Sequence, residues 1–299
     1  MLVYDYVDGE GYVFDRLRVF DFSHFMRKPL PRSIAIRHIW KSVLTKPKTK
    51  IAKAIWVNDV WGKGYFHWFA DVLHRYYQIY LQSNELLPMM LPAEYANYPY
   101  ITESLRALRI EAIWVQKDEL IQVSELLTID FLYCPGTFTV RAMRALREDI
   151  LSRLGTETQS PVQQAIYISR AKARMRKVSN EAEVLEVLLT QEIEQVHMET
   201  MSWSQQIRTL RSANILIGMH GAGLTNMMWM PYGSHIIELR MEGSEEQWAY
   251  YEMAATFGHH YHYLICEPEQ PGARPHDGNV RVDIPAFEQL LASVLNTAE

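Results

Sequence analysis

Short apolar segments alternate with stretches of helical periodicity from residue 51 almost to the end of the 299-residue chain. Residues 51–57 form an apolar run, and residues 65–81 then carry apolar side chains at helical spacing, with no proline or glycine among them. Strands are expected at 51–57, 86–91, 112–116, 165–169, 196–199, 215–219, 235–239 and 260–266, and helices at 65–81, 100–108, 138–154, 181–194, 204–212, 224–229, 246–257 and 285–295. This alternation favours an α/β fold with parallel sheets.

Residues 155–161 are the best candidate for a domain linker, because they are polar and end in a proline. We therefore predict an N-terminal domain of residues 1–154 and a C-terminal domain of residues 162–299, each Rossmann-like, that face each other across a cleft. Residues 1–50 are expected to form small strands and a solvated loop. Open α/β sheets bind ligands outside the carboxyl ends of their strands, so the residues that follow each strand are the candidate site residues.

The charge and the cysteine content exclude several classes of protein. A formal net charge of −5 provides no general basic field to hold nucleic acid. Cys134 and Cys266 are the two cysteines, and their separation excludes a disulfide framework and fits a reducing compartment. The first residues lack the basic region of a signal peptide, and no apolar run approaches the roughly 18 residues of a membrane helix. We expect a cytoplasmic protein of unknown oligomeric state; the lysines at 46–53 leave peripheral association with the inner face of the membrane open.

A basic loop follows the strand expected at 165–169. Five of the eight residues at 170–177 are cationic, and Asn180 with Glu183 has the spacing of a capping box that begins the next helix. A loop between a strand end and a helix N-terminus favours anions, so we predict a diphosphate site here. Its residues would be Ser169, Arg170, Arg174 and Lys177. The alternative is a solvated run of charge on the surface.

A glycine-rich turn, GMHGAGLTN at 218–226, follows the strand expected at 215–219. Gly221 and Gly223 allow close approach of a ligand to the main chain, and His220 can donate a proton to a departing phosphate. We predict that the amides of Leu224 and Thr225, the Thr225 hydroxyl and the Asn226 amide hold a phosphate or a sugar hydroxyl. The full candidate set is His220, Gly221, Ala222, Gly223, Leu224, Thr225 and Asn226. A buried histidine bonded to a carbonyl, with glycines that serve packing, is the alternative.

One carboxylate stands near the end of the next strand. Glu238 belongs to the apolar run at 235–239 and is placed to accept hydrogen bonds from both ribose hydroxyls of a nucleotide. A capping or salt-bridge role is equally compatible with this position.

The helix expected at 65–81 carries a second candidate cluster. His67, Asp71 and His74 are spaced to lie on one helix face, and a carboxylate beside an imidazole supplies a general base for a hydroxyl. The alternative is a helix contact together with a surface ion pair between Asp71 and Arg75.

Several motifs of other enzyme classes are absent from the sequence. It has no GxGxxG, no GxxxxGK[ST], no HExxH and no GxSxG. It also lacks an Asp-x-Asp pair, with which many nucleotide-sugar enzymes hold a divalent metal. Histidines at 259, 260 and 262 lie in an apolar strand without a spaced cysteine or histidine partner. We therefore expect no metal site.

The segment HGAGLTN at 220–226, followed by MPYGS at 230–234 and IIEL at 236–239, resembles glycosyltransferase family 61. The resemblance covers residues 160–297 well and residues 51–115 loosely. It implies a GT-B fold, a nucleotide-sugar donor held mainly by the C-terminal domain, transfer without a metal, and inversion at the anomeric carbon. Gly64, His74 and Gln205 depart from the residues that many members carry at these positions.

The resemblance also implies roles for the candidate residues. Arg170, Arg174 and Lys177 would neutralise the diphosphate, residues 220–226 would hold the phosphates and the sugar, and Glu238 would hold the ribose. Asp71 or His67 would act as the catalytic base.

The leading hypothesis is an inverting glycosyltransferase that moves a sugar from a nucleotide-sugar, with UDP as the expected nucleotide, to a glycan hydroxyl in polysaccharide biosynthesis, as in bacterial capsule formation. The donor is a substrate, and no cofactor is expected. The alternatives are a non-catalytic protein that binds a nucleotide-sugar and a partner protein in polysaccharide assembly.

Overall fold

The computed structural model divides the chain into two compact units, Met1–Pro135 (unit 1) and Gly136–Glu299 (unit 2). It describes residues 2–7, 10–15, 18–19, 36, 40, 47, 49–58, 61–117, 119–129, 138–155, 164–244 and 248–298. Residues 156–161 of the expected linker lie outside this described part. The division precedes the helix α5 (Val140–Arg153), whereas the sequence placed that helix in the N-terminal domain.

Unit 1 contains a seven-stranded mixed sheet in the order β3-β2-β1-β7-β4-β5-β6. Strands β4, β5, β6 and β7 are parallel, whereas β1 runs antiparallel to β7 and β2, and β2 runs antiparallel to β3. Their bounds are β1 Leu2–Val7, β2 Glu10–Asp15, β3 Arg18–Val19, β4 Thr49–Ile55, β5 Met89–Pro92, β6 Ala112–Val115 and β7 Leu120–Leu127. The parallel part confirms the predicted α/β class. Strand β7 was not predicted, because it follows β6 without an intervening helix.

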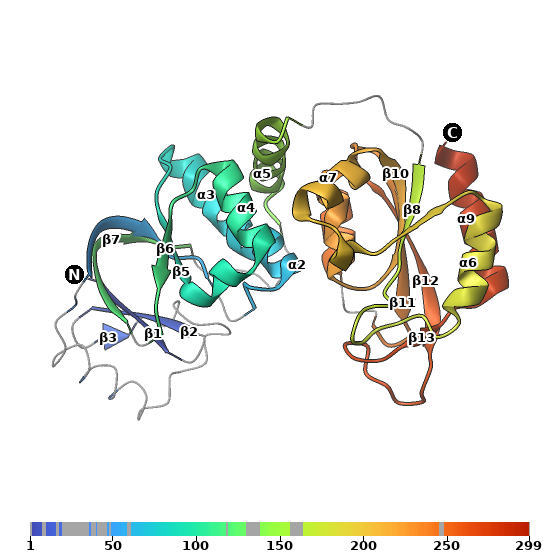
Figure 1. Ribbon diagram of the computed structural model, residues 1–299, viewed down its shortest axis with the longest axis horizontal. Helices are drawn as coiled ribbons and strands as arrows, with labels where there is room; N and C mark the ends of the chain where they lie inside the picture. Colours follow the sequence, from blue (N-terminus) through green and yellow to red (C-terminus); the bar gives the residue numbers. More distant parts are fainter. Residues whose placement is uncertain are drawn as a thin grey trace. The chain divides into compact units, whose positions relative to one another are not determined.

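The predicted helix at 65–81 is continuous but not uniform. It consists of α2 (Tyr65–His67), a π-helical segment η3 (Trp68–Leu73) and α3 (His74–Ser83). Helix α4 (Pro99–Leu108) follows the short 3-10 helix η4 (Ala93–Asn97), and Figure 1 shows α3 and α4 beside the β5–β6 part of the sheet. The Trp68 indole donates to the Ser104 hydroxyl at 2.9 Å and connects η3 to α4. A π-helical segment is uncommon and often marks a functional position.

Unit 2 contains a six-stranded sheet in the order β13-β12-β11-β10-β8-β9. Neighbours from β9 to β12 are parallel, and the short β13 is antiparallel to β12. The bounds are β8 Gln164–Ile168, β9 Glu194–Val196, β10 Ala213–Met219, β11 His235–Met241, β12 His260–Pro268 and β13 Val280–Arg281. The chain passes from β8 to β9 on one side and then to β10 on the other, which is the doubly wound pattern.

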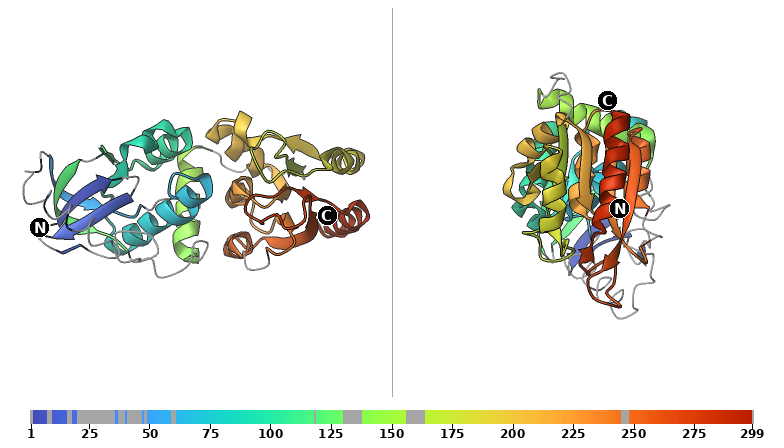
Figure 2. Two further views of the ribbon diagram at one scale, coloured as in Figure 1. Left: turned by 90° about the horizontal axis from the view of Figure 1, so that it is seen from below. Right: turned by 90° about the vertical axis from the view of Figure 1, so that its right-hand side faces the viewer.

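Helices cover both faces of this second sheet. On one face α6 (Glu181–Thr190) and α9 (Ile284–Ala298) pack over a core of buried aliphatic side chains. Helix α7 (Trp203–Arg211), the 3-10 helix η6 (Ala222–Trp229) and α8 (Ala249–Thr256) belong to the other face, and the short η5 (Met198–Thr200) precedes α7. Figures 1 and 2 show α6 and α9 together on one face and α7 on the opposite face. The Rossmann-like prediction is confirmed for this unit.

Hydrogen bonds from two arginines attach α5 to the rest of unit 2. Arg147 of α5 is buried and donates to the carbonyl oxygens of Met228 and Met230, each at 2.7 Å. Arg144 donates to the carbonyl oxygen of Thr256 at 2.8 Å. Because a buried guanidinium needs partners, these bonds explain why the compact unit begins before α5.

The predicted capping box at the start of α6 is wrong. Asn180 is the N-cap residue but makes no side-chain capping bond. Its amide instead accepts from the Val282 N–H and donates to the Val282 carbonyl, both at 2.9 Å. The Lys177 N–H donates to Asn279 Oδ1 at 2.8 Å, and the Val280 N–H donates to the Lys177 carbonyl at 2.9 Å. Backbone pairing with residues 279–282 therefore holds the end of the basic loop.

None of the helices in the described ranges combines the length and the apolar character that crossing a membrane requires.

Candidate active site

The candidate site of unit 2 lies at the carboxyl ends of two adjacent parallel strands. Ile168 of β8 pairs with Gly218 of β10, and the next residues are Ser169 and Arg170 on one strand and Met219 and His220 on the other. The sheet order reverses between these two strands. Crevices for ligands form at this position in doubly wound sheets. The structure thus brings together the two loops that the sequence singled out.

A buried carboxylate fixes the imidazole of His220. His220 Nδ1 lies 2.5 Å from Glu238 Oε1, and Glu238 is fully buried. The Tyr261 hydroxyl donates to the other carboxylate oxygen. Burial, followed by the nearby Glu238 charge, raises the pKa of Tyr261 well above its ordinary value, so the phenol keeps its proton.

This arrangement changes the interpretation of Glu238. Both of its oxygens are engaged by protein side chains, and none of its surface is exposed to a ribose. A direct ribose contact is not what the geometry favours. The contact with His220 instead engages Nδ1 and fixes the orientation of the imidazole.

Tyr250 packs against the same imidazole. The rings of His220 and Tyr250 meet edge to face with centroids 5.1 Å apart. Tyr250 is buried, and burial raises the pKa of its phenol well above the ordinary value. Glu238 and Tyr250 together restrict the rotation of the His220 ring, which is a form of preorganisation.

The guanidinium of Arg170 lies against the backbone of Gly221. Arg170 Nε donates to the Arg176 carbonyl at 2.8 Å, and Nη2 donates to the Met175 carbonyl at 3.1 Å. A Cβ atom on Gly221 would collide with Nη1 and approach Cζ to 3.1 Å. Only glycine therefore leaves room for this guanidinium.

Arg176 adds a second positive charge to this region. Burial, and then the Arg176 charge, lowers the pKa of Arg170. The Nε of Arg176 is buried and has no hydrogen-bond partner among the residues that the structure describes. Two neighbouring guanidinium groups that repel each other are stabilised by a bound anion.

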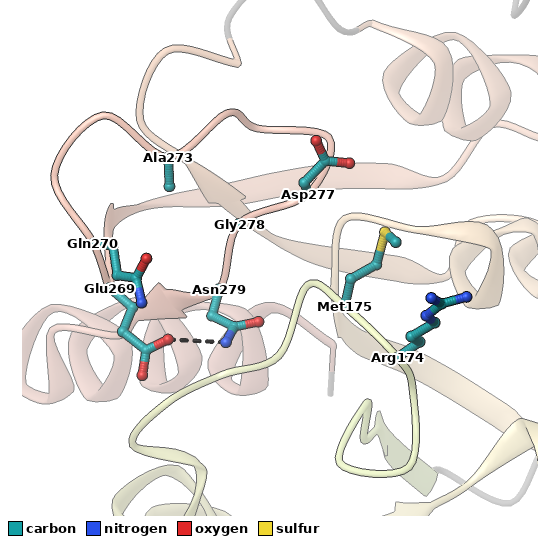
Figure 3. Close-up of a pocket in the computed structure, with 8 residues that line it drawn as sticks. All are labelled: Arg174, Met175, Glu269, Gln270, Ala273, Asp277, Gly278 and Asn279. Atoms are coloured by element: carbon teal, nitrogen blue, oxygen red, sulfur yellow. Dashed lines mark hydrogen bonds between the residues drawn. The ribbon is translucent and has the colours of Figure 1, made fainter.

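The remaining residues of the basic loop do not join this pair. The Ser169 hydroxyl accepts from the Ala171 N–H at 3.1 Å and shapes the turn, while the Lys177 backbone bonds to residues 279 and 280. Arg174 lines a separate cavity of about 210 Å³ formed with residues 269–279. Figure 3 shows Arg174 on one side of this cavity and the hydrogen-bonded Glu269 and Asn279 on the other, with Met175 between them.

Two donors of the glycine-rich turn bond within the turn itself. Leu224, Thr225 and Asn226 are buried. The Leu224 N–H donates to the Gly221 carbonyl at 2.9 Å, and the Asn226 amide donates to the Gly223 carbonyl at 3.1 Å. These bonds stabilise the turn, in which Ala222 and Gly223 are half-buried.

Unit 1 contains a second imidazole–carboxylate pair. His67 Nδ1 lies 2.7 Å from Asp71 Oδ2, across the junction of α2 and the π-helical segment η3. The Trp61 ring lies beside the imidazole at 5.3 Å between centroids. Arg75 Nε donates to the Asp71 backbone carbonyl at 3.0 Å. Arg75 thus bonds to the main chain of Asp71, whereas the Asp71 carboxylate contacts and orients His67.

The His74 imidazole does not take part in this pair, although the His74 backbone N–H donates to the Asp71 carbonyl. The His74 side chain is buried and lies 2.9 Å from the Gln78 amide nitrogen. Burial, followed by the Arg75 charge, lowers the pKa of His74 to about 4. Of the three predicted residues on this helix face, the structure joins two.

Sequence reasoning missed Tyr250, Tyr261 and Arg176 as site residues. Tyr250 falls within the helix expected at 246–257, and Tyr261 lies between histidines that were considered as metal ligands. Their contacts with His220 and Glu238 depend on long-range pairing of β11 with β12 and on the packing of α8. Arg176 was part of the basic run, but it was not separated from the other cations by any local signal.

Within the described ranges, no three His, Cys, Asp or Glu side chains lie close enough together to bind a metal ion. His235 stacks on His260 and on His262 with ring centroids 4.6 and 5.4 Å apart, at the amino ends of β11 and β12. These imidazoles lie at the opposite end of the strands from His220.

Comparisons with known proteins agree with this geometry. A family model described as glycosyltransferase 61 matches residues 65–237, a range that includes both His67 and His220. The EGF domain-specific O-linked N-acetylglucosamine transferase of Drosophila melanogaster is 24% identical over 261 residues, which cover 76% of this chain and 50% of the relative. The enzyme with the same description from Gallus gallus is 29% identical over 135 residues, covering 43% of this chain and 24% of the relative.

A relative with a different name matches a stretch about as long as the one matched by the Gallus gallus enzyme. The protein O-linked-mannose beta-1,4-N-acetylglucosaminyltransferase 2 of Xenopus laevis is 28% identical over 119 residues, covering 38% of this chain and 20% of the relative. The chain thus spans half or less of the length of these relatives. Because the family model matches more than half of its residues, the protein belongs to glycosyltransferase family 61.

Proposed function

We propose that this protein is an inverting, metal-independent glycosyltransferase that binds a nucleotide-sugar at the His220 site of unit 2 and transfers the sugar to a glycan hydroxyl. The observation that carries the proposal is the hydrogen bond between His220 and the buried Glu238, beside the Arg170–Arg176 pair. The geometry offers positive charge for a diphosphate and an oriented imidazole in one place. Membership in a glycosyltransferase family supports glycosyl transfer as the reaction class.

Departure of the nucleoside diphosphate is the step assigned to unit 2. As the bond between the anomeric carbon and the phosphate oxygen breaks, negative charge grows on the diphosphate. The guanidinium groups of Arg170 and Arg176 would neutralise that charge. With Nδ1 bonded to Glu238, a protonated His220 would donate from Nε2 to the departing oxygen.

Activation of the acceptor is assigned to unit 1. His67 Nε2 would remove the proton of the acceptor hydroxyl while the oxygen attacks the anomeric carbon opposite the leaving group. Asp71 would hold Nδ1 and stabilise the imidazolium that forms.

The substrates can be proposed more narrowly. N-acetylglucosamine is the first sugar to test, because the names of the matched relatives refer to its transfer. UDP is the proposed nucleotide, and a bacterial surface polysaccharide is the proposed product. A cytoplasmic location is part of the proposal, with the basic segment at 46–53 as the candidate for contact with the membrane surface.

Calorimetric titration with UDP and with UDP-N-acetylglucosamine, with and without EDTA, tests the donor site. We expect binding that survives EDTA and that Arg170→Ala weakens by about tenfold or more, because a charge-assisted hydrogen bond is lost. Lys172→Ala is the matched control, since Lys172 is an exposed cation of the same loop. Equal affinities for all three proteins would overturn the donor assignment. Donor binding without transfer to any acceptor would favour the non-catalytic alternative.

A further inference from the structure

An exposed row of aromatic side chains lies on unit 2, on residues to which the catalytic proposal gives no role. Trp248, Tyr251 and Tyr263 are 53%, 46% and 52% exposed. They come from the start of α8 and from β12, and Tyr261 of β12 lies at the base of the row. We call these four side chains the aromatic surface. Large exposed aromatic groups on regular elements mark interaction sites more often than isolated exposed residues do.

The four rings form one continuous row. Trp248 and Tyr251 meet with centroids 6.0 Å apart, Tyr251 and Tyr261 with centroids 5.5 Å apart, and Tyr261 and Tyr263 with centroids 6.2 Å apart. The first two pairs are nearly perpendicular, at 75° and 79°. Successive rings therefore face different directions and do not form one flat stack.

A buried arginine supports the row from beneath. The guanidinium carbon of Arg240 lies 5.5 Å from the Trp248 ring centroid and 5.8 Å from that of Tyr263. Arg240 is itself buried and donates to the Ser244 carbonyl. Cation–π contacts of this kind hold the exposed rings in place, so a ligand would meet a preorganised surface.

A chain of side-chain contacts links the aromatic surface to the candidate active site. Tyr261 contacts the rings of Tyr251 and Tyr263, and its hydroxyl donates to Glu238, which holds His220. The aromatic surface and His220 therefore belong to one connected group of side chains in unit 2.

We propose that the aromatic surface binds pyranose rings of a glycan acceptor. The C–H groups on one face of a pyranose carry partial positive charge and are attracted to the negative face of an aromatic ring, while the sugar hydroxyls stay in water or bond to tyrosine hydroxyls. Several half-exposed rings at different angles suit successive sugar units better than one planar nucleobase. The choice of a glycan rests on the proposed function; the surface itself is defined independently of it.

Saccharide binding and nucleotide binding are measured separately to test this. The probes are chitotriose, cellotriose, maltotriose and mannotriose, each titrated by calorimetry and by saturation-transfer NMR, and UDP is titrated in parallel. We expect the wild type to bind at least one trisaccharide with its ring C–H protons saturated. Trp248→Ala and Tyr263→Ala should each weaken that binding by about fivefold or more, with UDP affinity unchanged within about twofold.

Matched variants separate the aromatic contact from general damage. Trp248→Phe keeps a ring at this position and should retain most of the affinity. Tyr232→Ala removes an equally exposed aromatic ring elsewhere in unit 2 and should have no effect on saccharide binding. Thermal unfolding checks that each variant is folded. If Trp248→Ala does not fold, Tyr263→Ala tests the inference in its place.

The outcomes distinguish this inference from the proposed function. No trisaccharide binding by a wild type that binds UDP overturns the aromatic-surface inference alone. Loss of UDP affinity in Trp248→Ala with unchanged trisaccharide binding also overturns it, because the rings would then hold the nucleobase. Failure of the wild type to bind UDP counts against the proposed function, and the trisaccharide result then decides the inference by itself.

Discussion

His220 and Glu238 are joined by a hydrogen bond of 2.5 Å between Nδ1 and Oε1, although 17 residues separate them in the chain. Glu238 lies in β11, whereas His220 directly follows the end of β10. The carboxylate is buried, so this bond is shielded from water and fixes the orientation of the imidazole. His67 and Asp71 make the same kind of pair in unit 1 at 2.7 Å. In both pairs the carboxylate contacts Nδ1 of the histidine, and the proposed function assigns the proton transfers to Nε2.

Replacing Glu238 tests the orientation of His220. Glu238→Gln keeps the shape but removes the charge that stabilises a protonated His220. We expect kcat to fall by about 100-fold, which is within the range of general acid catalysis, while UDP affinity changes little. Tyr261→Phe removes only the second hydrogen bond to the carboxylate and should lower kcat less than Glu238→Gln does. A loss of UDP affinity in Glu238→Gln as large as its loss of kcat would contradict the orienting role.

Gly221→Ala should act through Arg170. The added methyl group would occupy the position of the guanidinium and displace it. UDP affinity is expected to fall by about tenfold, as for Arg170→Ala, because the same charge-assisted contact is lost. The double variant provides the control: in a double-mutant cycle the two losses should not add. Fully additive losses would show that Gly221 and Arg170 act independently.

His67 and Asp71 should affect transfer but not donor binding. We expect His67→Ala to reduce kcat by about 100-fold or more, and Asp71→Asn to reduce it less, because the base remains but is no longer oriented. His74→Asn is the comparison on the same helix, since the His74 imidazole lies beside Gln78 and its contact with Asp71 is made by the backbone, which the variant keeps. It should lower the melting temperature without lowering the specific activity of the folded fraction. Normal turnover in His67→Ala would remove His67 as the base.

Acid should destabilise the fold through buried neutral histidines. Burial lowers the pKa of His259 from 6.5 to about 4, and His259 Nε2 lies 3.0 Å from the Met227 carbonyl. Between these pH values the unfolded chain binds a proton that the folded chain does not, so stability falls as the pH is lowered from 6.5 toward 4. His259 alone accounts for about 3 kcal/mol over that window.

Urea unfolding at pH 7.5, 6 and 4.5 measures this pH dependence. His259→Gln should show a shallower loss of stability than the wild type over the same window, although His74 contributes a similar slope in both proteins. His276→Gln replaces an exposed histidine and should leave the slope unchanged. Identical slopes for all three proteins would mean that His259 is protonated in the folded state.

Hydrophobic periodicity predicted most of the fold because it is a local property. The helix at 100–108 and the strands β8, β10 and β11 appear close to their expected bounds, since each buries one face or both. The strand expected at 196–199 lies earlier, at Glu194–Val196. Strand β7 was missed because a strand that pairs across the sheet without a preceding helix breaks the alternation. The side-chain partner of Asn180, Val282, is far along the chain, and no local spacing reveals it.

The sequence predicted which loops form the candidate site more accurately than which side chains of those loops are exposed. The basic loop and the glycine-rich turn do meet at the ends of β8 and β10, as expected from parallel strands. Which side chains face outward was not predictable, because Thr225 and Asn226 are buried by the packing of η6. The engagement of Glu238 by His220 and Tyr261 likewise depends on the register of three strands.

The pairing of residues 177–180 with residues 279–282 has a consequence for how the loop responds to a ligand. Backbone and amide bonds join these two segments at both ends, from Lys177 with Asn279 to Asn180 with Val282. The loop end cannot open unless the segment before α9 opens with it. An anion that orders Arg170 and Arg176 would therefore slow amide hydrogen exchange at residues 280 and 282, about a hundred positions away in the sequence, as one cooperative unit.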